Sequence, residues 1–168
     1  MNPYVRDRYG DPCRACGFLW ALDDESCRRI IDDAPKSYAA LLVGRVGLEQ
    51  HPDLAWNASA YVAHVADNTR IWAERVAGTA LGDAGRVVPY DEEALGRARN
   101  YDGLGLQGAT WSLARAIGDW QAAEALADHD HILLLHPEQG RLELSQVRRV
   151  VAHELHHHAA DLHRIFSD

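Results

Sequence analysis

The residues best suited to chemistry lie in one stretch near the end of the chain, residues 150–165, which reads VVAHELHHHAADLHRI. This stretch holds five histidines and two carboxylates. His153 and His157 are four residues apart, so in a helix they lie one above the other on the same face. Two neutral imidazoles in that arrangement can ligate a single divalent metal. Asp161 continues the same face one turn further on.

A histidine-rich helix end also has a second interpretation, as a solvated terminus. Cationic histidines near a helix C-terminus are favoured by the helix dipole, and His163 and Arg164 fit that role. For His153 and His157 we favour metal ligation. Two helical histidines do not complete a metal site, so further ligands must come from elsewhere in the chain.

The elements that must position these ligands are helices. Apolar residues recur at three- and four-residue steps, and turn-forming residues separate the helical stretches. The pattern predicts long helices over residues 24–44, 57–78, 109–127 and 145–166, and a short helix over residues 91–99. Four long helices with loops between them indicate an all-α fold, a four-helix bundle.

The chain divides into a non-helical N-terminal leader over residues 1–22 and the bundle over residues 23–168. In the linker before the last helix, the ILLLH segment over residues 132–136 is expected to form a short extended piece. His129 and His131, in the same linker, are expected to be loop or surface residues.

Bundles of this kind build metal sites from side chains of facing helices. His64 is the only histidine of the second helix and lies well inside it, although a lone histidine there is more often a hydrogen-bonded core residue. With His153 and His157 it gives three imidazoles and a fourth position for water, which is typical of catalytic zinc sites. Nickel, cobalt, iron or manganese suit the same ligands.

Three polar residues beside these ligands are candidates for catalysis. Asn68 and Asp161, each one turn from a ligand, could orient a ligand or the substrate. Glu154 could act as a general base, or it could point sideways into solvent.

Cys13 and Cys16 form a CxxC motif in the leader. They could be buried thiols under a loop, half of a zinc site completed by a distant residue, or a redox pair. A first helix of about 20 residues spans ~30 Å, so the leader would have to fold back along the bundle to reach the His64 site. We therefore expect a second, separate role for the cysteines, and an additional metal site is one such role.

The composition excludes several classes of partner. The net charge of −8 argues against nucleic acid bound by general electrostatics. No apolar run approaches the ~20 residues that span a bilayer, and the N-terminus lacks the plan of a signal peptide. We therefore expect no membrane partner and a cytoplasmic location. Lys36 is the only lysine among 17 basic residues, a usage associated with high-GC, actinobacterial genomes.

The stretch YVAHVADNTRIWAERVAG around His64, together with HELHHHAADLHRI, resembles the DinB-like superfamily of four-helix metalloproteins. These include bacillithiol and mycothiol S-transferases and mycothiol-dependent maleylpyruvate isomerase. The resemblance implies a metal triad at His64, His153 and His157. CRACGF and SYAALLVG further resemble an actinobacterial subgroup that begins with a CxxCGF-like sequence. The resemblance extends over residues 13–165.

Three functions follow from these features. The first is a metal-dependent transferase that passes a low-molecular-weight thiol, such as mycothiol, to an electrophilic small molecule. The second is a Lewis-acid enzyme of natural-product biosynthesis that uses no thiol and carries out isomerisation, cyclisation, hydrolysis or elimination. The third is a non-catalytic metal-binding stress protein with a saturated metal, or a homodimer whose bundle surfaces pair.

Overall fold

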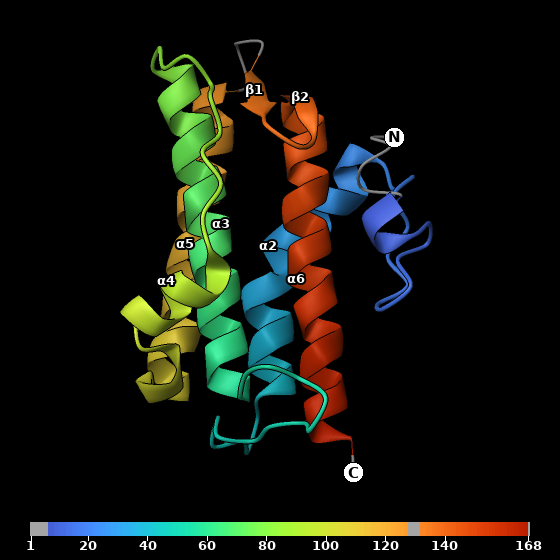
Figure 1. Ribbon diagram of the computed structural model, residues 1–168, viewed down its shortest axis with the longest axis vertical. Helices are drawn as coiled ribbons and strands as arrows, with labels where there is room; N and C mark the ends of the chain where they lie inside the picture. Colours follow the sequence, from blue (N-terminus) through green and yellow to red (C-terminus); the bar gives the residue numbers. More distant parts are fainter. Residues whose placement is uncertain (1–6, 128–131, 168) are drawn as a thin grey trace.

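The computed structural model describes residues 7–127 and 132–167. Its four long helices pack into one bundle, shown in Figure 1, which confirms the predicted all-α fold. They are α2 (Asp24–Leu41), α3 (Ala58–Ala80), α5 (Leu106–Ala127) and α6 (Leu144–Phe166). Among the described residues, no helix is long and apolar enough to cross a membrane.

Helices α3 and α5 run side by side in the same direction, and α2 and α6 run the opposite way (Figure 1). The starts of α3 and α5 meet at Gly47, where an added Cβ would lie 2.0 Å from Ser59 Oγ and 3.0 Å from Leu106 Cβ. Because the two helices are parallel, the chain between them must return along the bundle. That connection contains α4 (Glu92–Ala98) and the 3₁₀ helix η1 (Tyr101–Gly103).

Side-chain caps fix where three of the helices begin. The side chains of Asp23, Asn57 and Asp91 accept hydrogen bonds from backbone N–H groups in the first turns of α2, α3 and α4. At α6 the cap is Glu143, whose backbone N–H donates to Gln146 Oε1 at 2.9 Å. Helix α2 is continuous through Pro35.

A small hairpin joins α5 to α6. Strands β1 (Leu133–His136) and β2 (Gly140–Glu143) pair antiparallel, with Leu134 opposite Leu142. The extended segment predicted over residues 132–136 is therefore present, although its partner strand was not foreseen. His129 and His131 lie outside the described residues.

The leader packs against the face of α6 that points away from the bundle (Figure 1). Residues 7–9 are helical, and residues 10–23 form turns and irregular structure. The described part of the leader is therefore non-helical, as predicted, except for this short helical piece. Phe18 and Trp20 are buried, and the Trp20 indole N–H donates to the Gly10 carbonyl at 2.9 Å. The leader therefore has its own apolar contacts on α6.

A buried arginine ties three helices together at one end of the bundle. Arg148 is 2% exposed. Its guanidinium bonds Glu124 on α5 and Asp24 at the start of α2, the latter at 2.6 Å. A buried guanidinium is stable only when its donors are satisfied, so this contact fixes how the three helix ends meet.

We predict that Arg148→Met lowers the free energy of unfolding by about 2–3 kcal/mol, because Glu124 loses its nearer charged partner in a poorly solvated position and keeps only the longer contact with Arg28. Urea denaturation measures the effect. The matched control is Arg29→Met, which breaks an exposed pair with Glu25 and should change stability by less than about 0.5 kcal/mol. Equal effects of the two changes would contradict the structural role of Arg148.

Candidate metal centre

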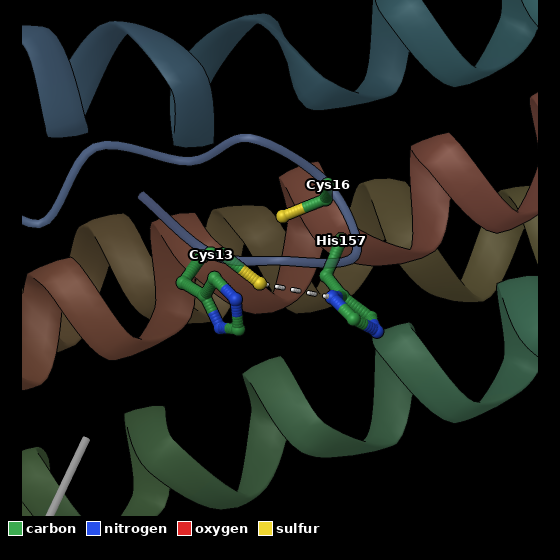
Figure 2. A group of neighbouring side chains, drawn as sticks. Cys13, Cys16 and His157 are labelled. Atoms are coloured by element: carbon green, nitrogen blue, oxygen red, sulfur yellow. Dashed lines mark hydrogen bonds between the residues drawn. The ribbon is translucent and has the colours of Figure 1, made fainter. Parts of the chain in front are cut away.

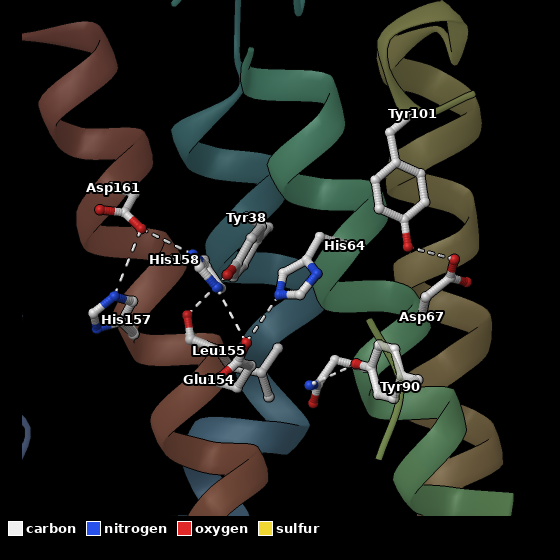
Figure 3. A network of polar contacts seen from close by, with 11 residues as sticks. Tyr38, His64, Asp67, Tyr90, Tyr101, Glu154, Leu155, His157, His158 and Asp161 are labelled. Carbon is white, nitrogen blue, oxygen red and sulfur yellow. Dashed lines mark hydrogen bonds and ion pairs between the residues drawn. The ribbon is translucent and has the colours of Figure 1, made fainter. Parts of the chain in front are cut away.

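A histidine from α3 and two residues of α6 converge between these helices. His64 Nε2 lies 3.0 Å from Glu154 Oε1, and His158 Nε2 lies 3.1 Å from the same oxygen (Figure 3). One ligand atom from each residue lies within 4.8 Å of the other two. The three residues form what we call the His64 cluster.

Aromatic rings enclose the His64 cluster. His64 is 2% exposed, and its ring centroid lies 4.9 Å from that of Trp56. The Tyr61 ring lies 5.2 Å from the ring of His158. Tyr38, on α2, donates its hydroxyl proton to the Leu155 carbonyl at 2.8 Å and holds α6 in register beside the cluster. The surroundings are therefore apolar, which strengthens every electrostatic contact inside.

Hydrogen bonds within the cluster lower the pKa of Glu154 and raise the pKa of His158. Burial alone would raise the pKa of the Glu154 carboxyl, but hydrogen bonds from His158 and His64 hold it well below its usual range. Burial disfavours a charged His158, yet its bonds to Asp161 and Glu154 raise its pKa to about 9. His158 is thus a cation between two carboxylates, with its Nδ1–H donating to Asp161 Oδ2 at 2.8 Å.

A divalent metal fits the His64 cluster by its donor chemistry. Two imidazole nitrogens and one carboxylate oxygen are a ligand set of catalytic zinc sites, in which a fourth position stays open. Two carboxylates, Glu154 and Asp161, lie 3.1 and 2.8 Å from the ring nitrogens of His158, so this position favours positive charge. A metal would supply that charge instead. Asp161 would then orient His158 from its Nδ1 side, as carboxylates behind metal-bound histidines do.

The structure does not bring the predicted triad of His64, His153 and His157 together. His64 groups with Glu154 and His158, whereas His153 and His157 group with Cys13 and Cys16. Among the described residues, His157 also groups with His158 and Asp161, and no group contains both His64 and His157. The physical reason is the helical period: consecutive residues of α6 point about 100° apart, so the 153/157 pair and the 154/158 pair occupy different faces. Both pairs have four-residue spacing, so spacing alone did not choose between them.

The sequence alone did not single out His158 as a ligand. The signal that identifies it is the apolar stripe of α6, whose buried members include Val147, Val151, Leu155 and Leu162. His158 lies four residues before Leu162 and seven after Val151, so it shares this inward face. His153 does not share it.

The three polar candidates have distinct surroundings. Glu154 does not point into solvent; it lies between two histidines, as a ligand would. Asp161 bonds His158. Asn68 donates from Nδ2 to the Tyr90 hydroxyl at 3.2 Å, and its buried Oδ1 has no hydrogen-bond partner within the described part of the chain.

A second cluster lies on the outer face of α6, where the leader crosses it. Ligand atoms of Cys13, Cys16, His153 and His157 all lie within 4.8 Å of one another. Figure 2 shows both thiols and His157 on the facing sides of the loop and the helix, with Cys13 Sγ 3.9 Å from His157 Nδ1. Burial lowers the pKa of His153 to about 4 and raises that of the Cys16 thiol to about 12.

A polar cleft of about 600 Å³ lies along α3 and α6, and none of the residues that line it belongs to the His64 cluster. It is bounded by α3, the connection that follows it, the hairpin, the leader and α6. Tyr90 joins the cleft to the cluster through its hydrogen bond to Asn68, which is one turn from His64. Its lining includes Arg8, Tyr9, Trp72, Arg75, Tyr90, Glu92, His136 and Val150.

No family model matches the chain, and no curated protein does either. Among solved structures, it resembles YfiT from Bacillus subtilis with a TM-score of 0.72 at 18% sequence identity. The match covers 84% of this chain and 85% of that one. That protein is described as a probable metal-dependent hydrolase with an unusual four-helix bundle topology. At this identity the likeness establishes a shared fold.

We predict that His158→Ala lowers the zinc retained after dialysis by about one equivalent per chain, because two remaining ligands do not hold a catalytic metal. Metal analysis of the folded protein measures the loss. His163→Ala is the matched control, since His163 is an exposed histidine of the same helix. Unchanged zinc content in the His158 variant would show that the His64 cluster is not a metal site.

Proposed function

We propose that this protein is a divalent-metal-dependent enzyme whose metal is held by His64, Glu154 and His158. The observation that carries the proposal is the convergence of these three ligands from two helices. A polar cleft is connected to them through Tyr90 and Asn68. Zinc is the metal we expect, and nickel, cobalt, iron or manganese suit similar ligands. The fold shared with YfiT supports the resemblance to the DinB-like superfamily. We also propose that the chain belongs to this superfamily and to its actinobacterial subgroup with the CxxCGF motif.

For the reaction we propose transfer of a mycothiol-like thiol to an electrophilic small molecule. A bound metal would lower the pKa of a coordinated thiol, so that sulfur reacts as the thiolate. The thiol would lose its proton to solvent, and sulfur would form a bond to the electrophilic carbon while the bond from that carbon to its leaving group breaks. A deep apolar cavity would have favoured a Lewis-acid enzyme without a thiol. The cleft instead carries charged and hydroxyl groups such as Arg75, Tyr90 and Glu92, which suit a sugar-linked thiol.

Residues between the cleft and the His64 cluster support substrate binding there. The buried Asn68 Oδ1 lacks a hydrogen-bond partner within residues 7–127 and 132–167, a state that costs about 1–3 kcal/mol. A hydroxyl or amide of a bound substrate would relieve it. The Asn68 amide also orients the Tyr90 hydroxyl, which lines the cleft. We assign Asn68 the role of a substrate-positioning residue.

Metal-dependent hydrolysis is the second candidate. The description of YfiT as a probable hydrolase favours it, because the two chains share a fold over most of their lengths. Hydrolysis would use the same three ligands and needs water instead of a thiol. A requirement for added thiol therefore separates the two candidates.

The non-catalytic hypothesis requires a saturated metal, to which the leader cysteines would be the additional ligands. In the described residues, Cys13 and Cys16 group with His153 and His157, and neither cysteine belongs to the group formed by His64. The cysteines thus leave an open position at the His64 cluster. This placement favours an enzyme over a stress protein that only stores metal.

We predict that the zinc-loaded protein conjugates mycothiol to a bimane electrophile, and that Glu154→Gln reduces the rate to background. Asp161→Asn should lower the rate about 10–100-fold, because it removes the group that orients His158. Fluorescence of the conjugate measures the rate, with His163→Ala as control. No metal-dependent conjugation would refute thiol transfer. Zinc-dependent ester or amide cleavage without thiol would then support the hydrolase.

A further inference from the structure

We propose that Cys13, Cys16, His153 and His157 form a second, closed zinc site that fastens the leader to α6. Two thiolates and two imidazoles are a complete tetrahedral ligand set for structural zinc, with no position left for substrate. All four ligand atoms lie within 4.8 Å of one another, although the residues are about 140 positions apart in sequence. This proposal does not depend on the activity proposed for the His64 cluster.

The strongest evidence is the environment of His153. This histidine is 3% exposed, and its Nε2 has no hydrogen-bond partner in the part of the chain that the structure describes. The rings of Tyr9, Phe18 and Trp20 pack around it, with the Trp20 centroid at 4.4 Å. A buried imidazole with an unpaired nitrogen is costly in such an apolar setting. Metal coordination would satisfy it.

The leader backbone presents both thiols to α6. A tight turn is closed by the Gly17 N–H, which donates to the Cys13 carbonyl at 2.8 Å, and by the Cys13 N–H, which donates to the Phe18 carbonyl at 2.9 Å. Gly17 has φ +75°, a conformation that glycine adopts without strain. His156 Nε2–H donates to the Cys16 carbonyl at 3.1 Å and docks the turn on the helix.

His157 is oriented as a metal ligand is. Its Nδ1 faces Cys13 Sγ at 3.9 Å, while its Nε2 lies 3.8 Å from Asp161 Oδ2 on the opposite side of the ring. A carboxylate behind the second nitrogen is the usual arrangement for histidines that bind zinc. Asp161 also bonds His158, so one carboxylate stands behind a ligand of each cluster.

A redox role explains these residues less well. Thiol–disulfide exchange requires an accessible sulfur that a partner thiolate can attack. Cys13 is 2% exposed, and only Cys16 of the pair is partly exposed. A redox pair also gives no reason for two imidazoles to face the thiols. Zinc binding accounts for all four residues: the ion displaces one proton from each thiol and requires no oxidant or reductant.

The closed site would also shape the cleft of the proposed enzyme. Tyr9 packs on His153 and lines the cleft, as does its neighbour Arg8. Fastening the leader to α6 therefore fixes one wall of the cleft. The zinc would be structural, acting on the substrate site only through the position of this wall.

Cobalt substitution tests the site directly in the intact wild-type protein. Cobalt bound by two thiolates should give a thiolate-to-metal charge-transfer band, which the His64 cluster cannot produce because it contains no sulfur. Zinc should compete the band away and protect the partly exposed Cys16 from a thiol reagent. The absence of a charge-transfer band, or a Cys16 thiol equally reactive with and without zinc, would overturn the proposal.

Variants separate the two clusters. Cys16→Ser and His153→Gln should each remove the charge-transfer band and about one equivalent of zinc. His64→Gln should keep the band and lose the other equivalent. Cys27→Ala is the matched thiol control, because Cys27 is buried elsewhere, on α2, and should leave both metals in place. A charge-transfer band that survives in Cys16→Ser, or one lost in His64→Gln, would contradict the assignment.

Limited proteolysis tests the structural role. With zinc bound, cleavage within residues 7–22 should be slow, and removal of zinc with a chelator should make it fast in wild-type protein. In His153→Gln the same segment should be cleaved rapidly whether or not zinc is present. Equal protection of the leader in zinc-loaded and chelated wild-type protein would show that no metal fastens it.

Discussion

The period of one helix governs the chemistry of this protein. The apolar stripe of α6, with Val151 and Leu155 at its centre, must face the bundle core because burial of these side chains stabilises the fold. Once that face packs into the core, the helical period determines where every other side chain of α6 points. Glu154 and His158 point toward α3, and His153 and His157 point toward the leader. One helix thereby supplies ligands to two clusters of different chemistry.

Each cluster takes its remaining groups from one other element. At α3 the partner is His64, and the enclosed cluster offers nitrogen and oxygen donors. Asn68 and Tyr90 connect it to the polar cleft. At the leader the partners are two thiols, and rings of aromatic residues exclude water. Asp161 lies behind both clusters, within reach of His157 and His158. A charge at one cluster therefore changes the electrostatic potential at the other, because their separation is short and the surroundings are apolar.

The parallel arrangement of α3 and α5 creates the room in which a substrate could bind. Parallel neighbours require a long return connection, and here it holds α4, η1 and Tyr90. The connection is anchored to α3 through Asp67, whose carboxylate accepts from the Tyr101 hydroxyl at 2.7 Å and pairs with Arg99 at 2.8 Å. In an antiparallel bundle with short loops, no such connection would run back along α3.

The sequence by itself determined the helices, because caps such as Asn57 and three- and four-residue apolar steps are local signals. It also identified His64, Cys13 and Cys16 as candidate functional residues. Only the tertiary structure decided which residues share a cluster. Pairs 153/157 and 154/158 have identical spacing, so the choice between them depends on which face α3 covers. The return of the leader to His153 depends on packing between segments distant in sequence, which no local pattern encodes.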